Sequence, residues 1–268
     1  MRGIRTIAVS ILVLAGALSL GAGWLAPHDY AIQFREHANE PPSPNFLLGT
    51  DELGRDRLSR LLEGSRVSLL CAPIAASIAT AIGAVVGLVA GYFGGWVDEV
   101  VNATTDLFLS LPWLFALLTL RALLPLNISP WASLAATFLL LAALGWAPGA
   151  RVVRAGTSAM RDAGPILHAR AYGCSGMRLL WRHILPNLWP ILSAQFWILV
   201  PVFLLTEANL GVLGLGVMEP MPSLGNMLAE LQNYQRIPEA PWILAPAVLL
   251  VLVIASLHFV VSGRKTWE

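Results

Sequence analysis

The sequence is poor in charge. Asp, Glu, Lys and Arg make up 12% of its 268 residues, about half of the roughly 25% that is usual in soluble globular chains. Apolar residues make up 56%, and the mean hydropathy is +0.68. This composition excludes a soluble fold, which needs more polar surface, and intrinsic disorder, which needs low hydropathy and high charge. It indicates an integral membrane protein built of helices.

The motifs of several chemistries are missing as well. Two cysteines are too few for a disulfide scaffold. The only lysine, Lys265, lies in Gly-Arg-Lys-Thr, whereas a phosphate-binding loop ends in Gly-Lys-Ser/Thr. The histidines form no His-Glu-x-x-His zinc pair, and no Gly-x-Ser-x-Gly elbow is present. We therefore predict no enzyme active site, metal site or cofactor in this chain. The net charge of +1 predicts no nucleic-acid partner.

Six apolar stretches predict membrane-spanning helices, because a helix of about 18 or more apolar residues crosses the roughly 30 Å hydrocarbon core. They cover residues 6–26, 68–92, 100–120, 130–148, 188–211 and 242–261. The third contains Asp106 and the fifth contains Glu207, the only acids within these spans. An acid inside a membrane is a functional candidate by default, and pairing inside the helix bundle is the equally weighted alternative.

These spans divide the chain into regions, which we predict as follows. They are an N-terminal transmembrane anchor (1–26), an extracytoplasmic segment (27–67), a core with spans two to six (68–262) that includes a cytoplasmic loop (149–186), and a cytoplasmic tail (263–268).

The first two regions carry local signals. Arg2 and Arg5 precede the first apolar run, so a cleaved signal peptide is the alternative to a retained anchor. In the second region an amphipathic helix is expected from Asp56, with Arg57 and Arg60 on its polar side. Such a helix suits the membrane surface, and a plain connector with a solvated charged face is the alternative.

Orientation follows from Arg and Lys, which are enriched on the cytoplasmic side of membrane proteins. The N-terminus, the loop 149–186 and the tail carry two, six and two of the seventeen basic residues, and the opposite side carries seven. We therefore expect a multi-pass protein in contact with membrane lipid, with both termini and this loop in the cytoplasm.

The loop 149–186 is too long for a plain connection and predicts two or three short helices. One helix is expected to end near Tyr172, with Gly173 in the left-handed position after it. Ser175 is expected to cap the next helix, which runs to about residue 185. An apolar stripe on that helix is expected to dock on a partner protein, with an anionic lipid surface as the alternative. Its members are Met177, Leu180, Trp181 and Ile184.

The segment 212–241 is rich in Gly and Pro, which prevent a regular helix. Ser223 is expected to cap a short helix that runs to Leu228. Lipid cannot satisfy a broken backbone, so this segment must be buried in protein or exposed to water. It suits a gate or the lining of an external vestibule.

Together these stretches resemble the permease subunits of importer-type ABC transporters. They are most similar to the second, C-type, inner-membrane component of the dipeptide/oligopeptide/nickel branch. The loop resembles the family pattern E-A-A-x-x-x-G-x9-I-x-L-P through Ala169, Gly173 and the stretch 183–187. Further similar stretches are LGTDELGRD at 48–56, GYFGGWVD at 91–98, GW with ARVVR at 145–154, EA with LGLG at 207–216, and PS with GNML at 222–228.

The resemblance implies an all-α type I importer permease fold, with six transmembrane helices and a cytoplasmic coupling helix near 167–177. It implies a bacterial or archaeal inner membrane and four kinds of partner. These are a second homologous permease subunit, two ATP-binding subunits that hold ATP and Mg, an extracytoplasmic solute-binding protein and membrane lipid. This chain would form half of a translocation path for peptides or a similar small solute.

Particular residues take roles from this resemblance. Those expected to couple to the ATPase are Leu167, His168, Ala169, Arg170, Tyr172, Gly173, Cys174, Ser175 and Met177. Those expected in the translocation path or gate are Asp106, Glu207, Asn209 and Asn226.

The loop departs from the family pattern at three positions. Leu167 stands at the position of the glutamate, His168 at that of the first alanine, and Pro165 where an aromatic residue is usual. The lost charge implies either a divergent ATPase partner or weakened coupling. A membrane-embedded enzyme that uses Asp106 and Glu207, and an ATP-independent channel, are the competing hypotheses for function.

Overall fold

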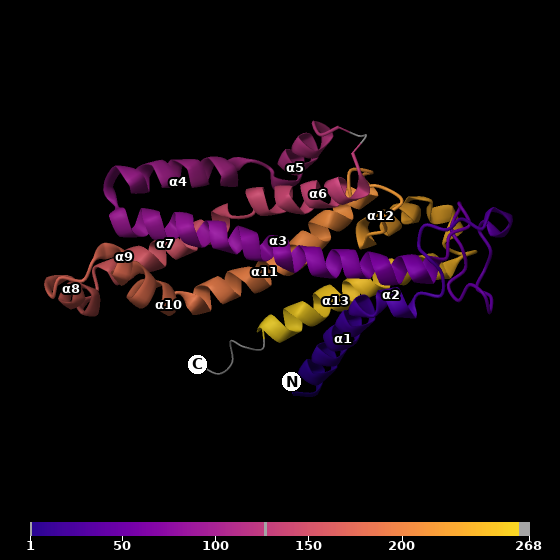
Figure 1. Cartoon of the computed structure of the whole chain (residues 1–268), viewed down its shortest axis with the longest axis horizontal. Coiled ribbons are helices and arrows are strands. Elements are labelled where there is room, and N and C mark those ends of the chain that lie inside the picture. The colour runs from indigo at the N-terminus through magenta and orange to yellow at the C-terminus, as the bar shows by residue number, and fades with distance from the viewer. Residues whose placement is uncertain (1, 126–127, 263–268) are drawn as a thin grey trace. The chain divides into compact units, whose positions relative to one another are not determined.

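The computed structural model describes residues 2–125 and 128–262, and nearly all of their regular structure is helical (Figure 1). The α-helices are α1 (Arg2–Leu20), α2 (Ala22–Leu25), α3 (Arg57–Phe93), α4 (Gly95–Ser110), α5 (Trp113–Ala122), α6 (Pro130–Leu144), α7 (Ala147–Arg161), α8 (Gly164–Ala171), α9 (Gly176–Leu179), α10 (Leu185–Asn187), α11 (Trp189–Val212), α12 (Leu224–Leu228) and α13 (Ala245–Ser262). Short 3-10 turns and one π-turn, Leu180–Ile184, join some of them. The all-α prediction is confirmed.

Five helical segments of the described residues are long and apolar enough to cross a membrane: Gly3–Leu20, Arg57–Phe93, Pro130–Arg161, Trp189–Val212 and Pro241–Val261. The predicted span over 100–120 is wrong in one respect: it is not a single helix, because α4 and α5 meet there at 84°. Pro112 follows Leu111, whose extended backbone (φ −74°, ψ 132°) ends α4, as a residue before proline disfavours the helical region. The expected six spans are reached only when this bent pair is counted as one.

The predicted separate surface helix after Asp56 is also wrong. Helix α3 begins at Arg57 and continues without a break through the second span. The carboxylate of Asp56 accepts a hydrogen bond from the backbone N–H of Ser59 (3.1 Å), as an N-cap residue does. Gly64 alone does not stop a helix. The stretch read as amphipathic is therefore the first part of a long membrane helix.

The chain divides into two compact units. The first comprises Met1–Ala72, Arg121–Phe138 and Pro201–Glu268, and the second comprises Pro73–Leu120 and Leu139–Val200. In the first unit α1 packs along α13, and α12 also packs on α13 (Figure 1).

In the second unit, glycines four residues apart let α3 approach α7 closely. They are Gly83, Gly87 and Gly91. A Cβ atom at Gly87 would lie 2.6 Å from the carbonyl oxygen of Ala150, and one at Gly91 would lie 2.6 Å from that of Arg154. Small residues at this spacing allow membrane helices to pack backbone to backbone. This close packing of the glycines holds α7 against α3. The loop that leads to α8 begins at the end of α7.

We predict that Gly87→Leu destabilises the protein by about 1–3 kcal/mol, because the added side chain must push α7 away from α3. The matched control is Gly16→Leu in α1, where a Cβ would meet nothing within 4 Å. The free energy of unfolding, measured by denaturant titration in mixed micelles, should fall for the first variant and stay level or rise for the second. Equal stability of the two variants would contradict this packing.

Candidate functional site

The first candidate site is the loop around α8 in the second unit. After Tyr172, which ends the helix, Gly173 has a φ of +80°. Its N–H donates to the carbonyl of Arg170 (3.0 Å), and the N–H of Cys174 donates to that of Ala169 (3.1 Å). This pair of bonds is the Schellman motif, which closes a helix through a left-handed residue. The predicted left-handed conformation of Gly173 after the end of the helix is confirmed.

One side of this loop is buried and the other is exposed. Ile166 is buried and packs in a cluster with Val153, Leu179 and Ile184. Tyr172, in contrast, has 90% of its surface exposed. Of the residues predicted to couple to an ATPase, Ala169 and Cys174 are half-buried, and the exposed ones are Leu167, His168, Arg170, Tyr172, Gly173, Ser175 and Met177. The structure therefore brings the predicted residues together on one loop, which is exposed on one side and packed against the core on the other.

The end of α3 supports this loop. The guanidinium of Arg170 lies over the ring of Tyr92, 5.6 Å from its centroid. A Cβ atom at Gly176 would lie 2.7 Å from the Tyr92 hydroxyl, so the loop returns directly against this side chain. Asp162, at the entry to the loop, accepts a hydrogen bond from the Arg161 Nε (3.0 Å), and this bond lowers the pKa of the Asp162 carboxyl below its usual value. Tyr92 of α3 thus contacts the loop both at Arg170 and at Gly176.

The apolar stripe after α8, which was predicted to dock on a partner protein, is only partly exposed. Met177 and Trp181 are exposed, but Ile184 is fully buried and Leu180 packs against the same cluster. The π-turn Leu180–Ile184 changes the helical register, because a π-turn has i→i+5 bonds. The stripe expected from regular α-helical spacing is therefore split between the surface and the core. Ser175 is the N-cap residue of α9, as predicted, but its side chain makes no capping bond.

Asp106 lies in α4 and its side chain is exposed. It forms an ion pair with Arg151 of α7. Arg151 lies in the predicted cytoplasmic loop and not in a predicted span, so the sequence did not identify it as the partner of this acid. Its neighbour on the same helix, Asp98, pairs in the same way with Arg154. Asp106 is therefore paired, but both side chains of this pair are exposed and do not lie inside the bundle.

The second candidate site is a buried polar network around Glu207 in the first unit. The side chain of Glu207 is completely buried. Its carboxyl oxygens accept hydrogen bonds from the hydroxyl of Ser68 (3.1 Å), the hydroxyl of Ser223 (2.6 Å) and the N–H of Gly225 (3.2 Å). The Ser68 hydroxyl in turn accepts the N–H of Leu224 (3.0 Å). One carboxyl thus ties α11 and α3 to the start of α12.

Asn226 belongs to the same network. Its N–H donates to the Ser223 hydroxyl (3.1 Å), and its side-chain oxygen accepts the N–H of Ser223 (2.9 Å). This reciprocal capping box confirms the predicted cap at Ser223. Asn209 is exposed, two residues beyond Glu207. Among the predicted path residues, therefore, only Glu207 and Asn226 are brought into one network.

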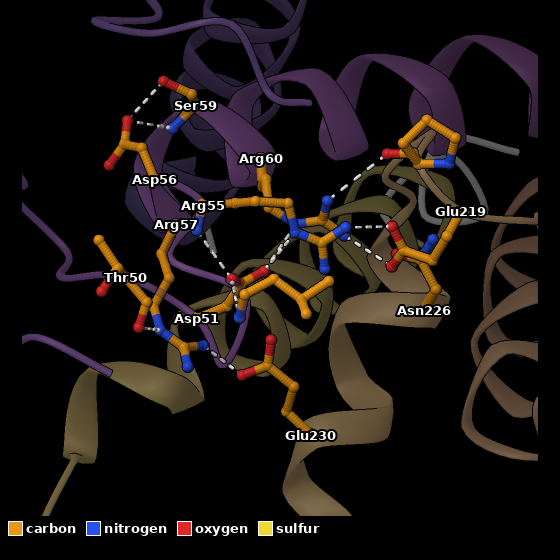
Figure 2. Close-up of polar contacts among 12 residues, drawn as sticks. Thr50, Asp51, Arg55, Asp56, Arg57, Ser59, Arg60, Glu219, Asn226 and Glu230 are labelled. Atoms are coloured by element: carbon orange, nitrogen blue, oxygen red, sulfur yellow. Dashed lines mark hydrogen bonds and ion pairs between the residues drawn. The ribbon is translucent and has the colours of Figure 1, made fainter. Parts of the chain in front are cut away.

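Ion pairs that the sequence did not predict join the segment before α3 to the segment around α12 (Figure 2). Arg55 reaches Asp51 (2.6 Å) and Glu219 (2.6 Å), and Arg60 reaches the other oxygen of Glu219 (2.8 Å). Arg57 pairs with Glu230. Burial by itself would lower the pKa of Arg55, but the facing Glu219 and Asp51 outweigh it and raise the pKa.

These arginines correct an expectation. The helical pattern placed Arg57 and Arg60 on a solvated face, yet they are 5% and 3% exposed. Their partners are about 160 to 170 residues away in sequence, so no local pattern could reveal them. A further arginine, Arg121, is also buried and donates to the Ser133 hydroxyl (2.6 Å) and the Gly216 carbonyl (3.1 Å).

The described residues thus form helices long enough to cross a membrane, an exposed loop helix and a broken segment held between two of these helices, an architecture that suits a helical permease subunit. The family model described as "Binding-protein-dependent transport system inner membrane component" matches residues 83–263. The chain belongs to this family. It is a multi-pass protein of the bacterial membrane and the transmembrane subunit of an ATP-driven importer.

Several relatives support this assignment. A putative peptide permease protein of Brucella suis biovar 1 is 34% identical over 228 residues, which cover 85% of this chain and 74% of the relative. The di/tripeptide transport system permease protein DppC of Pseudomonas aeruginosa is 32% identical over 254 residues, covering 92% and 81%. The inward-facing MetNI methionine ABC transporter has a similar fold, with a TM-score of 0.57, 22% identity, and coverage of 77% of this chain and 95% of that one.

We predict that Glu207→Ala lowers the free energy of unfolding by about 3 kcal/mol or more, because it leaves three donors unpaired and a cavity in the interior. Glu207→Gln should lose less, since its amide oxygen still accepts from Ser223 and Gly225. Asn209→Ala on the same helix is the exposed control and should change stability by about 0.5 kcal/mol or less. Denaturant titration in mixed micelles measures all three variants. A Glu207→Ala protein as stable as the control would rule out the structural role of the network.

Proposed function

We propose that this chain is one of two homologous permease subunits of a peptide importer and forms half of its translocation path. The relatives are peptide permeases by name, and the family description refers to a binding-protein-dependent system. An extracytoplasmic solute-binding protein would deliver the peptide. Two ATP-binding subunits would hold ATP and Mg and carry out hydrolysis, so this chain would not itself be an enzyme.

The observation that carries the proposal is the displayed loop around α8. Tyr172 and Leu167 are exposed, while Ile166 is anchored in the core cluster beside α7 and α11. A rigid loop of this kind transmits a push from a docked ATPase to the helices behind it. Since Leu167 replaces the acid of the family pattern, we expect apolar contact rather than an ion pair at this position. The loop and both termini would then lie in the cytoplasm.

The polar residues near the spans take two different parts in this proposal. Asp106 and Asn209 are exposed on the isolated subunit and are the candidates for contact with a passing peptide. Glu207 is buried and Asn226 is hydrogen-bonded within its own segment. We expect these two to shape the wall of the path by holding the segment around α12, without touching the solute.

We predict that Gly173→Glu abolishes ATP-driven peptide uptake while the spans remain folded. The position is open, since a Cβ meets nothing within 4 Å, so the substitution alters the docking surface and not the interior. Peptide uptake and ATP hydrolysis by the purified assembly in proteoliposomes measure the effect, and the melting temperature reports folding.

Two matched variants separate docking from backbone strain. Gly173→Ala places a Cβ at the same φ of +80°, which non-glycine residues adopt at a cost of about 1 kcal/mol. Gly173→Asn tolerates this conformation better. Both should retain most uptake. Normal uptake and hydrolysis by the Gly173→Glu assembly would show that this loop does not couple the ATPase to the spans.

A further inference from the structure

A half-polar pocket of about 440 Å³ lies in the first unit, where the first span leads into the segment before α3. Ala22, Gly23 and Ala26 form one part of its lining, and the first turns of α3 form another. The polar part comes from His28, Asp29, Tyr30, Glu63 and Arg66. This pocket is separate from the loop around α8 and from the Glu207 network.

The polar groups of the pocket are poorly satisfied by the protein itself. Arg66 reaches Glu63 at only 3.5 Å. His28 Nδ1 is buried without a hydrogen-bond partner among the described residues, and the nearest carboxylate oxygen, on Asp56, is 3.6 Å away. One Asp29 oxygen accepts the N–H of Ala31 (2.8 Å). The pocket therefore presents acids and a guanidinium with spare bonding capacity.

The acids dominate the field at the Tyr30 hydroxyl. Burial and then the charges of Asp29 and Glu63 raise the pKa of Tyr30, against an opposing effect of Arg60. A negative field next to a single guanidinium suits a ligand that carries a cation beside an anion. Such a ligand would place its cation near Asp29 and Glu63 and its anion near Arg66.

Features around the pocket suit the membrane–water boundary. Helix α3 has 37 residues and is about 55 Å long, which exceeds the roughly 30 Å hydrocarbon core. Glu63 and Arg66 lie just before its apolar stretch begins. Trp24, beside the pocket, is 93% exposed, and tryptophan is enriched at this boundary. One helical turn after Arg66 in α3, Leu70 is also exposed.

We propose that this pocket binds the headgroup of phosphatidylethanolamine, a phospholipid that carries a primary ammonium group. The ammonium donates to the carboxylates of Asp29 and Glu63, and the phosphate accepts from Arg66. The acyl chains then lie along the exposed apolar side chains of Leu25 and Leu70. A trimethylammonium headgroup has no N–H to donate, and a glycerol headgroup has no cation, so both should bind more weakly.

The test is native mass spectrometry of the full chain, released from vesicles with equal amounts of phosphatidylethanolamine, phosphatidylcholine and phosphatidylglycerol of identical acyl chains. We expect phosphatidylethanolamine to be retained about three- to fivefold over the other two, as exposed charged contacts allow. Glu63→Gln and Arg66→Gln should each remove this preference. Both side chains are partly exposed, so the variants should remain folded.

Matched controls are Glu36→Gln and Arg35→Gln, the same substitutions at exposed positions outside the pocket. They should keep the preference. Equal retention of the three lipids by the unmodified chain, or equal behaviour of pocket and control variants, would overturn the proposal. Displacement of phosphatidylethanolamine by millimolar dialanine, a soluble zwitterion, would overturn the lipid assignment in favour of a free solute. None of these outcomes depends on whether the chain imports peptides.

Discussion

Lipid offers no hydrogen bonds to a protein backbone, and the first unit of this structure is arranged around that constraint. The chain breaks its helical run between α11 and α13, so side chains and neighbouring backbone must satisfy the freed groups. Glu207 binds the start of α12, Arg121 binds the carbonyl of Gly216, and Asn226 closes the turn through the carbonyl of Met221. Arg55 and Arg60 hold the same region through Glu219. Some of the few charged side chains of the sequence thus hold the region where the helical run is broken.

The second unit uses local means to display its loop. A left-handed glycine ends α8, a Schellman pair closes it, and Ile166 anchors it in the core. Close glycine packing of α3 on α7 stiffens the base from which the loop leaves. A lever between an ATPase and the membrane helices, the role that we propose for this loop, must move as one body. The packing of this loop and the exposed side chains of Leu167 and Tyr172 are both what the proposed docking on an ATPase requires.

The sequence allowed the parts of the structure that depend on local chemistry to be predicted. Hydropathy located the membrane helices, and single residues identified the left-handed turn at Gly173 and the helix cap at Ser223. The predictions that were wrong depend on contacts between residues far apart in sequence or on a shift in helical register. Arg57 and Arg60 are buried because their partners lie far along the chain, and Ile184 is buried because a π-turn shifts the helical face. The bend between α4 and α5 follows Leu111–Pro112, and the mean hydropathy of this stretch does not reveal a bend.

The central claim is that the loop around α8 contacts an ATP-binding subunit on the cytoplasmic side of the membrane. Site-specific photo-cross-linking in the assembled importer tests it most directly, with the photoreactive group at position 172, which is 90% exposed. A matched probe at position 36, which is also exposed, lies in the segment that we place on the extracytoplasmic side of the membrane. The account predicts an adduct with the ATP-binding subunit from position 172 and none from position 36. An ATPase adduct from position 36, or none from position 172 in an assembly that transports, would contradict it.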